Sequence, residues 1–283
     1  MAEHEIQTNS HESNQEFSHE ATLFAEPIFH FGSFTVTNSL IMSWITVFVL
    51  VIFFVAVGKK IKKIPKGLQN VFEMILEKAL ELGDSITGER KRTEIFLPIS
   101  MALFLFILVN NWLGLLPGVG TIGFNEVEGA HRVFVPILRG GTADINTTLA
   151  LALFAVVASH VMGVLAIGVW SHLNKFINFE AFLEIPGKIR KDATIILVNP
   201  IKAFVGIVEV IGEVAKVASL TFRLFGNIFA GEVLLASMMA LFAYFLPLPF
   251  MFLEMIVGII QALIFAILTM VFMTIATEKH AEH

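Results

Sequence analysis

Uncharged apolar runs long enough to cross a bilayer dominate the sequence. Residues 39 to 58, SLIMSWITVFVLVIFFVAVG, contain no charged side chain, and residues 95 to 116 form a second such run. A helix of ~20 apolar residues spans the hydrocarbon core of a membrane. Within lipid, only helices and closed barrels satisfy every backbone hydrogen bond. We find none of the short alternating strands that a barrel needs, so the sequence predicts an all-α integral membrane protein.

The composition agrees with a membrane protein and excludes several kinds of site. Of the 283 residues, 56% are hydrophobic and 15% are charged, and the mean hydropathy is +0.79. A chain this apolar is not expected to fold as soluble domains. The absence of cysteine excludes disulfides, thiolate metal sites and cysteine nucleophiles. We expect one helical membrane domain, residues 38 to 283, after an uncleaved polar tail, residues 1 to 37, which has no signal-peptide core.

The hydropathy pattern predicts five membrane-crossing helices and one amphipathic surface helix. The expected crossings are 38–58, 95–116, 145–170, 194–246 and 249–277, and the surface helix is 66–86. The fourth crossing is too long for a helix that runs straight through the bilayer. At 1.5 Å per residue, ~40 residues would extend ~60 Å, twice the hydrocarbon thickness. The last two helices are therefore expected to form a long, strongly tilted hairpin around the turn LPLP at 246–249.

The distribution of basic residues predicts the orientation of the chain. Residues 59 to 94 contain nine Lys and Arg, whereas residues 117 to 144 contain Arg132 and Arg139. Lys and Arg concentrate in cytoplasmic loops. A second basic loop follows the third crossing and contains Lys175, Lys188, Arg190 and Lys191. This pattern places the N-terminus outside, in the periplasm, and the C-terminus in the cytoplasm.

Arg223 is a lone cation within the fourth crossing. A central arginine costs roughly 2.5 to 3.5 kcal/mol on insertion scales, and intramembrane charges commonly mark ion pathways, relays or partner contacts. At ~100° per residue, Lys216 and Asn227 lie within about 40° of Arg223 and share a polar stripe with Glu209 and Glu213. The alternative is a snorkelling or structurally paired arginine.

Glu232, Glu254 and Gln261 complete the polar positions of the last two helices. Glu232 lies about 180° from Arg223, and Glu254 and Gln261 lie within about 20° of one face of the last helix. The antiparallel hairpin is expected to place Glu232 and Glu254 on the outer side, Arg223 deeper, and Glu209 and Glu213 on the inner side. Carboxylates in such sites can relay protons. Alternatively, they neutralise Arg223 or accept a hydrogen bond from a buried amide.

Several motifs carry a resemblance to a known family. They are RLFGN at 223–227 followed by AGE at 230–232, TADIN at 142–146, FLFILVNNWLGLLP at 104–117, and Gln261. From about residue 25 to its end, the chain resembles subunit a of the F-type ATP synthase. The resemblance implies a non-catalytic subunit of the bacterial inner membrane whose arginine faces a rotating c-ring. It also implies two offset half-channels, with roles for Arg223, Asn227, Glu232 and Gln261.

This chain departs from some relatives, which pair a glutamate with a histidine at the positions of Glu232 and Glu254. Two nearby carboxylates are expected to titrate as a coupled pair. Asp144 and Asn146 either shape the outer channel mouth or cap the third crossing, as Asp and Asn commonly do. Glu209 and Glu213 are the candidate inner channel. We expect His160 to serve packing and hydrogen bonding, and Lys216 to pair with Glu213 or Glu209.

The predicted function is that of a proton-translocating stator subunit in which Arg223 separates two half-channels. The expected partners are the c-ring, the peripheral-stalk subunit b, other ATP synthase subunits and membrane lipid, with no nucleic acid. No cofactor and no metal are expected. The sequence favours protons over sodium and leaves two alternatives open. One is a stand-alone ion channel or secondary transporter, although no inverted repeat is visible; the other is a passive assembly scaffold.

Overall fold

The computed structural model describes residues 22–32, 34–59, 67–128, 131–177, 195–242 and 245–278. Five long helices form its main body, and all five are apolar and long enough to cross a membrane. They are α1 (Asn38–Gly58), α3 (Arg90–Gly114), α4 (Ile145–Ile167), α7 (Ile195–Leu241) and α8 (Pro247–Thr277). The shorter helices are α2 (Leu68–Thr87) and α5 (Val169–Ile177). The expected fold class is thus confirmed for these residues.

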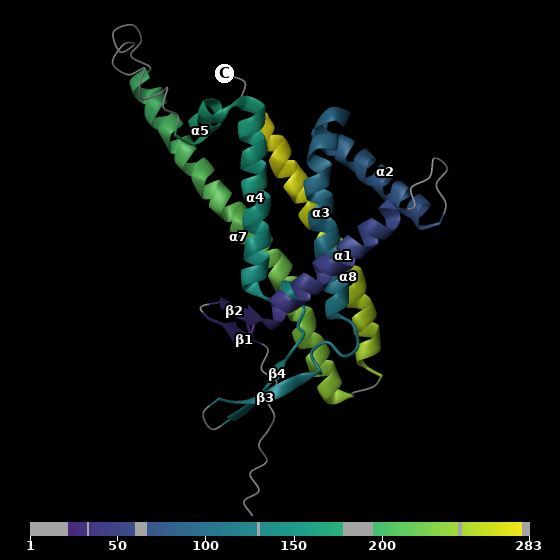
Figure 1. Ribbon diagram of the computed structural model, residues 1–283. Coiled ribbons are helices and arrows are strands. Elements are labelled where there is room, and N and C mark those ends of the chain that lie inside the picture. The colour runs from purple at the N-terminus through teal and green to yellow at the C-terminus, as the bar shows by residue number, and fades with distance from the viewer. Residues whose placement is uncertain are drawn as a thin grey trace, which may run out of the picture.

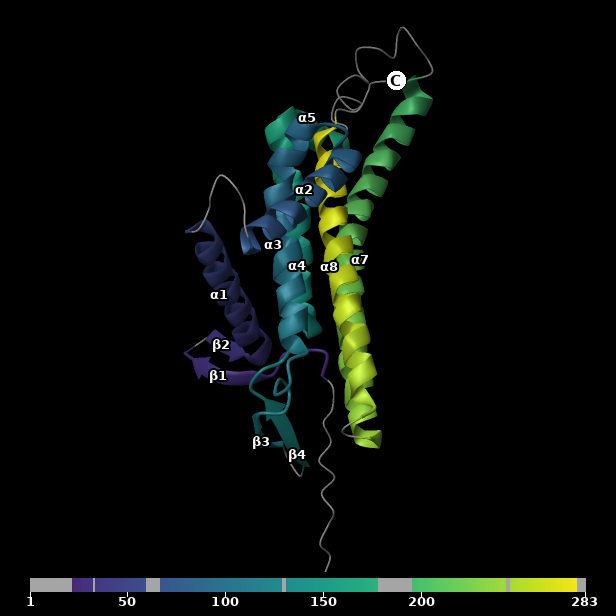
Figure 2. The ribbon, with the colours of Figure 1, turned by 90° about the vertical axis from the view of Figure 1, so that its right-hand side faces the viewer.

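The helices form an elongated bundle with two distinct ends. Helices α3, α4 and α8 stand side by side, and α1 leans away from them (Figure 1). Helices α7 and α8 pack together toward one end and diverge toward the other, where α5 lies (Figure 2). We call the first the strand end, because short β-strands lie there, and the second the α5 end. The last two helices therefore form the expected long hairpin.

The core lies between α3, α4, α7 and α8. Ala152 and Ala155 of α4 and Ala262 of α8 are fully buried, and they pack with the larger side chains Ile107, Leu224 and Phe265. Small residues at these positions allow helix backbones to approach closely, which is how membrane helices gain van der Waals contact. This packing fixes one face of α7 against the bundle and leaves its other face outside.

Two antiparallel β-hairpins lie at the strand end, so the expectation that alternating strands are absent was wrong there. They are β1 (Pro27–Phe31) with β2 (Phe34–Thr37), and β3 (Gly123–Glu128) with β4 (His131–Pro136). Of the expected tail at 1–37, residues 22–32 and 34–37 are described, and they include β1 and β2. In each hairpin, the backbone N–H and C=O groups of one strand pair with those of the other. These segments lie at the end of the helical bundle, so they do not need to be helical to satisfy their backbone groups. Residues 1–21 lie outside the described residues.

Helix boundaries differ from the expected ranges where glycine or tertiary packing intervenes. Helix α4 ends at Ile167 because Gly168 adopts φ 87°, which favours glycine, and α5 begins immediately afterwards. Helix α7 is unbroken over 47 residues, about 70 Å at 1.5 Å per residue. The expected choice between a tilted and a broken helix is thus narrowed, because α7 is not broken. The basic segment at 60–66 and the loop at 178–194 lie outside the described residues.

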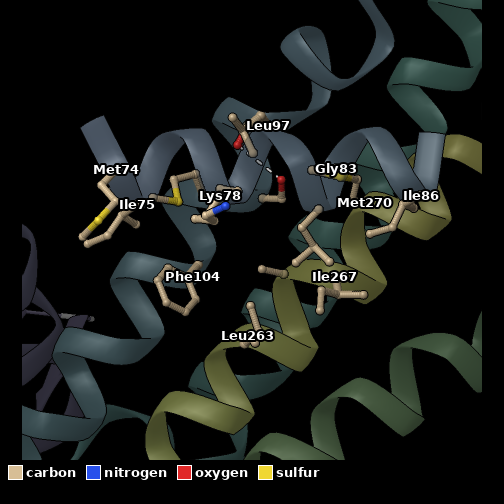
Figure 3. A pocket seen from close by; sticks show the side chains of 15 residues that line it. Met74, Ile75, Lys78, Gly83, Ile86, Leu97, Phe104, Leu263, Ile267 and Met270 are labelled. Atoms are coloured by element: carbon tan, nitrogen blue, oxygen red, sulfur yellow. Dashed lines mark hydrogen bonds between the residues drawn. The ribbon is translucent and has the colours of Figure 1, made fainter. Parts of the chain in front are cut away.

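The amphipathic helix α2 packs its apolar face toward α3 and α8. The three helices enclose an apolar cavity of about 350 Å³, with Met74, Phe104 and Leu263 among its lining residues (Figure 3). Lys78 at its margin pairs with Glu81 at 2.7 Å, and both are exposed. A cavity with almost no polar surface offers an ion no hydrogen-bonding path, so we assign it to packing rather than to transport.

Gly83 sets how closely α2 approaches the bundle. A Cβ atom at this position would collide with Thr93 Cγ2 and lie 3.2 Å from Met270 Sδ. Thr93 and Met270 are both buried, so neither side chain can move freely. Overpacking of this kind typically destabilises a protein by about 1 to 3 kcal/mol.

We therefore expect Gly83→Ala to lower the apparent melting temperature of the detergent-solubilised protein, measured by intrinsic fluorescence on heating. Gly58→Ala in α1 is the matched control, because nothing lies within 4 Å of the added Cβ. The control gains helix propensity without a clash and should melt at the wild-type temperature or above. Equal melting temperatures for both variants would contradict this account of α2 packing.

Candidate functional site

Arg223 lies on the outward face of α7. Arg223, Phe222 and Gly226 are exposed, whereas Leu224 and Phe225 on the opposite side are buried. Arg223 Nη2 donates to Ser219 Oγ of the same helix at 3.3 Å. Among the described residues, no carboxylate forms an ion pair with it. The alternative interpretation, that Arg223 is neutralised by an ion pair, therefore finds no support among the described residues.

Asn227 and Gln261 connect α7 to α8 one turn beyond Arg223. Asn227 Nδ2 donates to Gln261 Oε1 at the long distance of 3.5 Å. Gln261 is 5% exposed, and its Nε2 atom is buried without a hydrogen-bond partner in the described part of the chain. An unsatisfied buried amide is costly unless it has a role. The two amides expected near the arginine are thus brought together.

A polar cavity of about 320 Å³ opens at the strand end of α7. Glu232, Glu254 and Arg139 supply its charged groups, and Asn111 and Thr142 are among its other polar groups. Glu232 comes from α7 and Glu254 from the first turns of α8, so the hairpin does bring the two carboxylates into one cavity. Arg139 lines the same cavity. It was not predicted from the sequence as part of this site.

Arg139 is the principal partner of Glu232. It is 4% exposed, and its Nε and Nη2 atoms donate to the Glu232 carboxylate at 2.9 to 3.2 Å. Its Nη1 and Nη2 also donate to the Thr22 hydroxyl and the Thr22 and Phe24 carbonyls. A two-pronged ion pair of this kind is geometrically specific. The signal for Arg139 in the sequence is weak, a basic residue beside two glycines in a loop.

Glu254 differs from Glu232 in its surroundings. No described residue forms a hydrogen bond or ion pair with its carboxylate, which faces the cavity and the backbone of Gly231. A Cβ atom at position 231 would collide with the Glu254 carboxyl group. The missing side chain of Gly231 therefore creates the space in which this carboxylate sits.

Asp144 and Asn146 lie outside this cavity. Asp144 is 3% exposed, and its carboxylate caps α4 by accepting from the Asn146 amide at 3.2 Å and the Thr147 hydroxyl at 3.0 Å. It also accepts from the Ala25 amide and the Ser39 hydroxyl. The contacts of Asp144 therefore support its role as a helix cap. Through them, Asp144 also connects the start of α4 to the segments that contain Ala25 and Ser39.

A second polar cavity of about 160 Å³ lies toward the α5 end. Its polar lining consists of Ser159, His160, His172, Glu209, Glu213 and Lys216. The predicted pairing of Lys216 is confirmed, because its Nζ lies 2.7 Å from Glu213 Oε1. Lys216 Nζ also lies 5.2 Å from the centre of the Phe272 ring. The two predicted inner carboxylates therefore share one cavity.

Two histidines join this second cavity. His160 Nδ1 lies 3.1 Å from His172 Nε2, and His160 Nε2 lies 3.4 Å from Glu213 Oε2. The expected hydrogen-bonding role of His160 is confirmed. His172 was not predicted from the sequence; it belongs to α5 and reaches His160 through the turn at Gly168. Among the described residues, no three His, Asp or Glu side chains are placed so that they could hold a metal ion together.

Arg223 lies between the two polar cavities along α7. Seven residues separate it from Lys216 and nine from Glu232, about 10 Å and 14 Å of helix rise. The lining residues of the two cavities do not overlap.

Comparisons with known proteins identify the family of this chain. The family model described as ATP synthase A chain matches residues 40–274. ATP synthase subunit a of Syntrophobacter fumaroxidans is 35% identical over 249 residues, 88% of this chain and 87% of the relative. The subunit a of Mycobacterium tuberculosis is 33% identical over 78% of each chain. The chain therefore belongs to the ATP synthase subunit a family, the non-catalytic membrane subunits of a rotary enzyme.

Proposed function

We propose that this chain is the proton-translocating stator subunit of an ATP synthase membrane sector and provides two half-channels to a rotating c-ring. One observation carries the proposal. Two separate polar cavities lie on opposite sides of the exposed Arg223 along α7. A continuous channel would let protons bypass the motor, whereas two offset cavities require a carrier that moves between them.

The outer half-channel is assigned to the cavity at the strand end. Glu254 accepts protons there, because its carboxylate faces the cavity without a fixed partner among the described residues. Glu232 is held in place by Arg139, which compensates its charge, and it lines the route as a fixed polar group. Asn227 and Gln261 lie between this cavity and Arg223. Asp144 and Asn146 support the channel mouth by capping α4 rather than by lining the cavity.

The inner half-channel is assigned to the cavity near the α5 end, with Glu209 and Glu213 among its polar groups. The basic loops of the sequence favour a cytoplasmic position for this end. The strand end and the N-terminus then lie in the periplasm, and the C-terminus lies in the cytoplasm of a bacterium. Protons enter at Glu254, ride on a ring carboxylate, and leave near Glu213 during ATP synthesis.

Arg223 acts as the electrostatic barrier between the two routes. Its charge opposes direct proton passage and favours the ionised form of a ring carboxylate that passes beside it. The membrane potential supplies ~2.3 kcal/mol per charge per 100 mV, so a leak at this point would dissipate the driving force. Gly226 and Ala230 are exposed on the same face, and their small size allows the c-ring helices to pass closely. The peripheral-stalk subunit b and the other subunits complete the stator.

We expect Arg223→Ala to abolish ATP synthesis and permit passive proton leak, because removal of the cation opens the barrier. The measurement uses the whole ATP synthase in proteoliposomes, with ATP synthesis and dye-reported proton flux recorded together. Arg223→Lys should also impair coupling, since a flexible ammonium replaces a planar guanidinium and can lose its proton.

Ser237→Ala is the control on the same helix, because the Ser237 hydroxyl donates to Val233 O of its own helix and to no other described residue. It should couple normally. Coupled synthesis in Arg223→Ala would refute the barrier role, and specific flux through this subunit without a ring would favour a stand-alone channel. Repeating the measurement with a sodium gradient identifies the ion.

We expect Gly231→Ala to slow proton entry by displacing the Glu254 carboxyl group while removing no titratable group. The expected result is a several-fold lower rate of ATP synthesis with coupling intact, measured against the pH at the strand end. Gly58→Ala repeats the glycine-to-alanine change where no atom lies nearby. A wild-type rate for Gly231→Ala in fully assembled enzyme would remove Glu254 from the proposed route.

A further inference from the structure

We propose that Arg139 determines the ion specificity of the outer half-channel, by keeping sodium and other monovalent metal cations out of the cavity that protons enter. The inference rests on the proposed function, because it concerns the cavity assigned to proton entry. It extends that function by naming a residue that selects the ion before the ion reaches the ring. The observation behind it is a guanidinium fixed in the wall of a cavity that serves a cation.

The described lining of this cavity contains three charged side chains, those of Arg139, Glu232 and Glu254. Two carboxylates alone would give the cavity a double negative charge and four oxygen atoms. Carboxylates arranged around a pore are a means by which cation channels attract metal ions. The third group changes this balance, because a guanidinium keeps its positive charge at every pH the protein meets.

Arg139 occupies both oxygens of the Glu232 carboxylate. Its Nε atom lies 3.0 Å from Oε1 and 3.2 Å from Oε2, and its Nη2 atom lies 2.9 Å from Oε2. A metal cation would have to displace these charge-assisted hydrogen bonds before Glu232 could bind it. The carboxylate of Glu254 then remains, and it has no hydrogen bond or ion pair with any described residue. The cavity therefore presents one uncompensated carboxylate rather than two.

The N-terminal segment before β1 holds the guanidinium in place. Nη1 of Arg139 donates to the Thr22 hydroxyl at 2.9 Å and to the Phe24 carbonyl at 3.2 Å, and Nη2 donates to the Thr22 carbonyl at 2.8 Å. The segment is itself fixed to the start of α4, where the Ala25 amide donates to the Asp144 carboxylate at 3.2 Å. Arg139 is 4% exposed, so its charge cannot turn into water without breaking these bonds.

A proton and a metal cation place different demands on such a cavity. A proton binds one carboxylate oxygen covalently, and the neutral carboxyl group that forms is not repelled by a neighbouring cation. A sodium ion keeps its charge and needs several oxygen ligands in place of its water shell. Charges interact more strongly in a cavity walled by protein than in bulk water. The fixed arginine therefore opposes a metal ion for as long as the ion stays, but opposes a proton only until the proton is bound.

The test uses the whole ATP synthase in proteoliposomes, with sodium chloride confined to the side of the strand end. Choline chloride is the reference, because at ~0.1 M both salts screen charges equally, with a Debye length of about 10 Å. ATP synthesis is measured per assembled enzyme in each salt. We expect sodium to leave the wild-type rate unchanged and to slow Arg139→Gln several-fold, because Glu232 and Glu254 then form a pair of uncompensated carboxylates.

Three further variants separate charge selection from a structural role. Arg139→Lys keeps a positive charge beside Glu232 and should keep the resistance to sodium, whatever its rate in choline. The double variant Arg139→Gln with Glu232→Gln removes the released carboxylate and should restore the resistance. Leu235→Glu adds a carboxylate to the cavity wall while Arg139 is in place, and it should create sodium inhibition. Leu235→Gln, of the same shape without the charge, should not.

Arg90→Gln is the matched control for loss of an arginine. Arg90 Nη1 lies 2.8 Å from Asp84 Oδ2, so this change also removes a guanidinium–carboxylate pair. Neither residue lines the outer or the inner cavity. The rate of this variant should be the same in sodium and in choline.

Equal rates of Arg139→Gln in sodium and in choline would overturn the proposal. Should Arg139→Gln not assemble, equal rates in the two salts for Leu235→Glu would overturn it. Sodium inhibition that persists in the double variant would do so as well, because it would not depend on the released carboxylate. In each case, uncoupling by Arg223→Ala would leave the proposed half-channels standing, whereas coupled synthesis in Arg223→Ala would refute the proposed function itself.

Discussion

The position of Arg223, a cation that has no ion pair among the described residues, depends on the one-sided packing of α7. Arg223 is exposed on the outward face and bonds Ser219, while the opposite face of the helix is packed into the core through Leu224 and Phe225. A charge in this position is tolerated when it meets water or a partner. The exposed face of α7 around Arg223 follows from this one-sided packing.

The carboxylates of the site have different surroundings, and this bears on the unusual pair of glutamates at 232 and 254. Glu232 has a fixed counter-charge in the buried Arg139, whereas Glu254 has no hydrogen bond or ion pair with any described residue. Two glutamates can therefore take different parts in one cavity. A histidine is not needed at position 254 for the two groups to differ, because the environment already distinguishes them.

Glycines place several of the polar groups that the bundle contains. Gly231 leaves space for the Glu254 carboxyl group and Gly163 leaves space for the His172 ring. A Cβ atom at Gly141 would similarly crowd the Asn110 amide and the Ser43 hydroxyl. Because interiors are closely packed, a polar side chain can enter between two helices only where a neighbour has no side chain. Loss of such a glycine is expected to act through the polar group beside it.

The sequence by itself determined the class of fold, the five long apolar helices, the amphipathic α2, the lone Arg223 and the family. These depend on local hydropathy, helical periodicity and short motifs. Tertiary structure decided the pairing of Arg139 with Glu232, the contact of His160 with His172 and the capping role of Asp144. Arg139 and Glu232 are 93 residues apart, and helical periodicity gives only the face on which each residue lies. Which faces meet depends on how the helices pack, and that depends on side-chain volumes and glycines throughout the bundle.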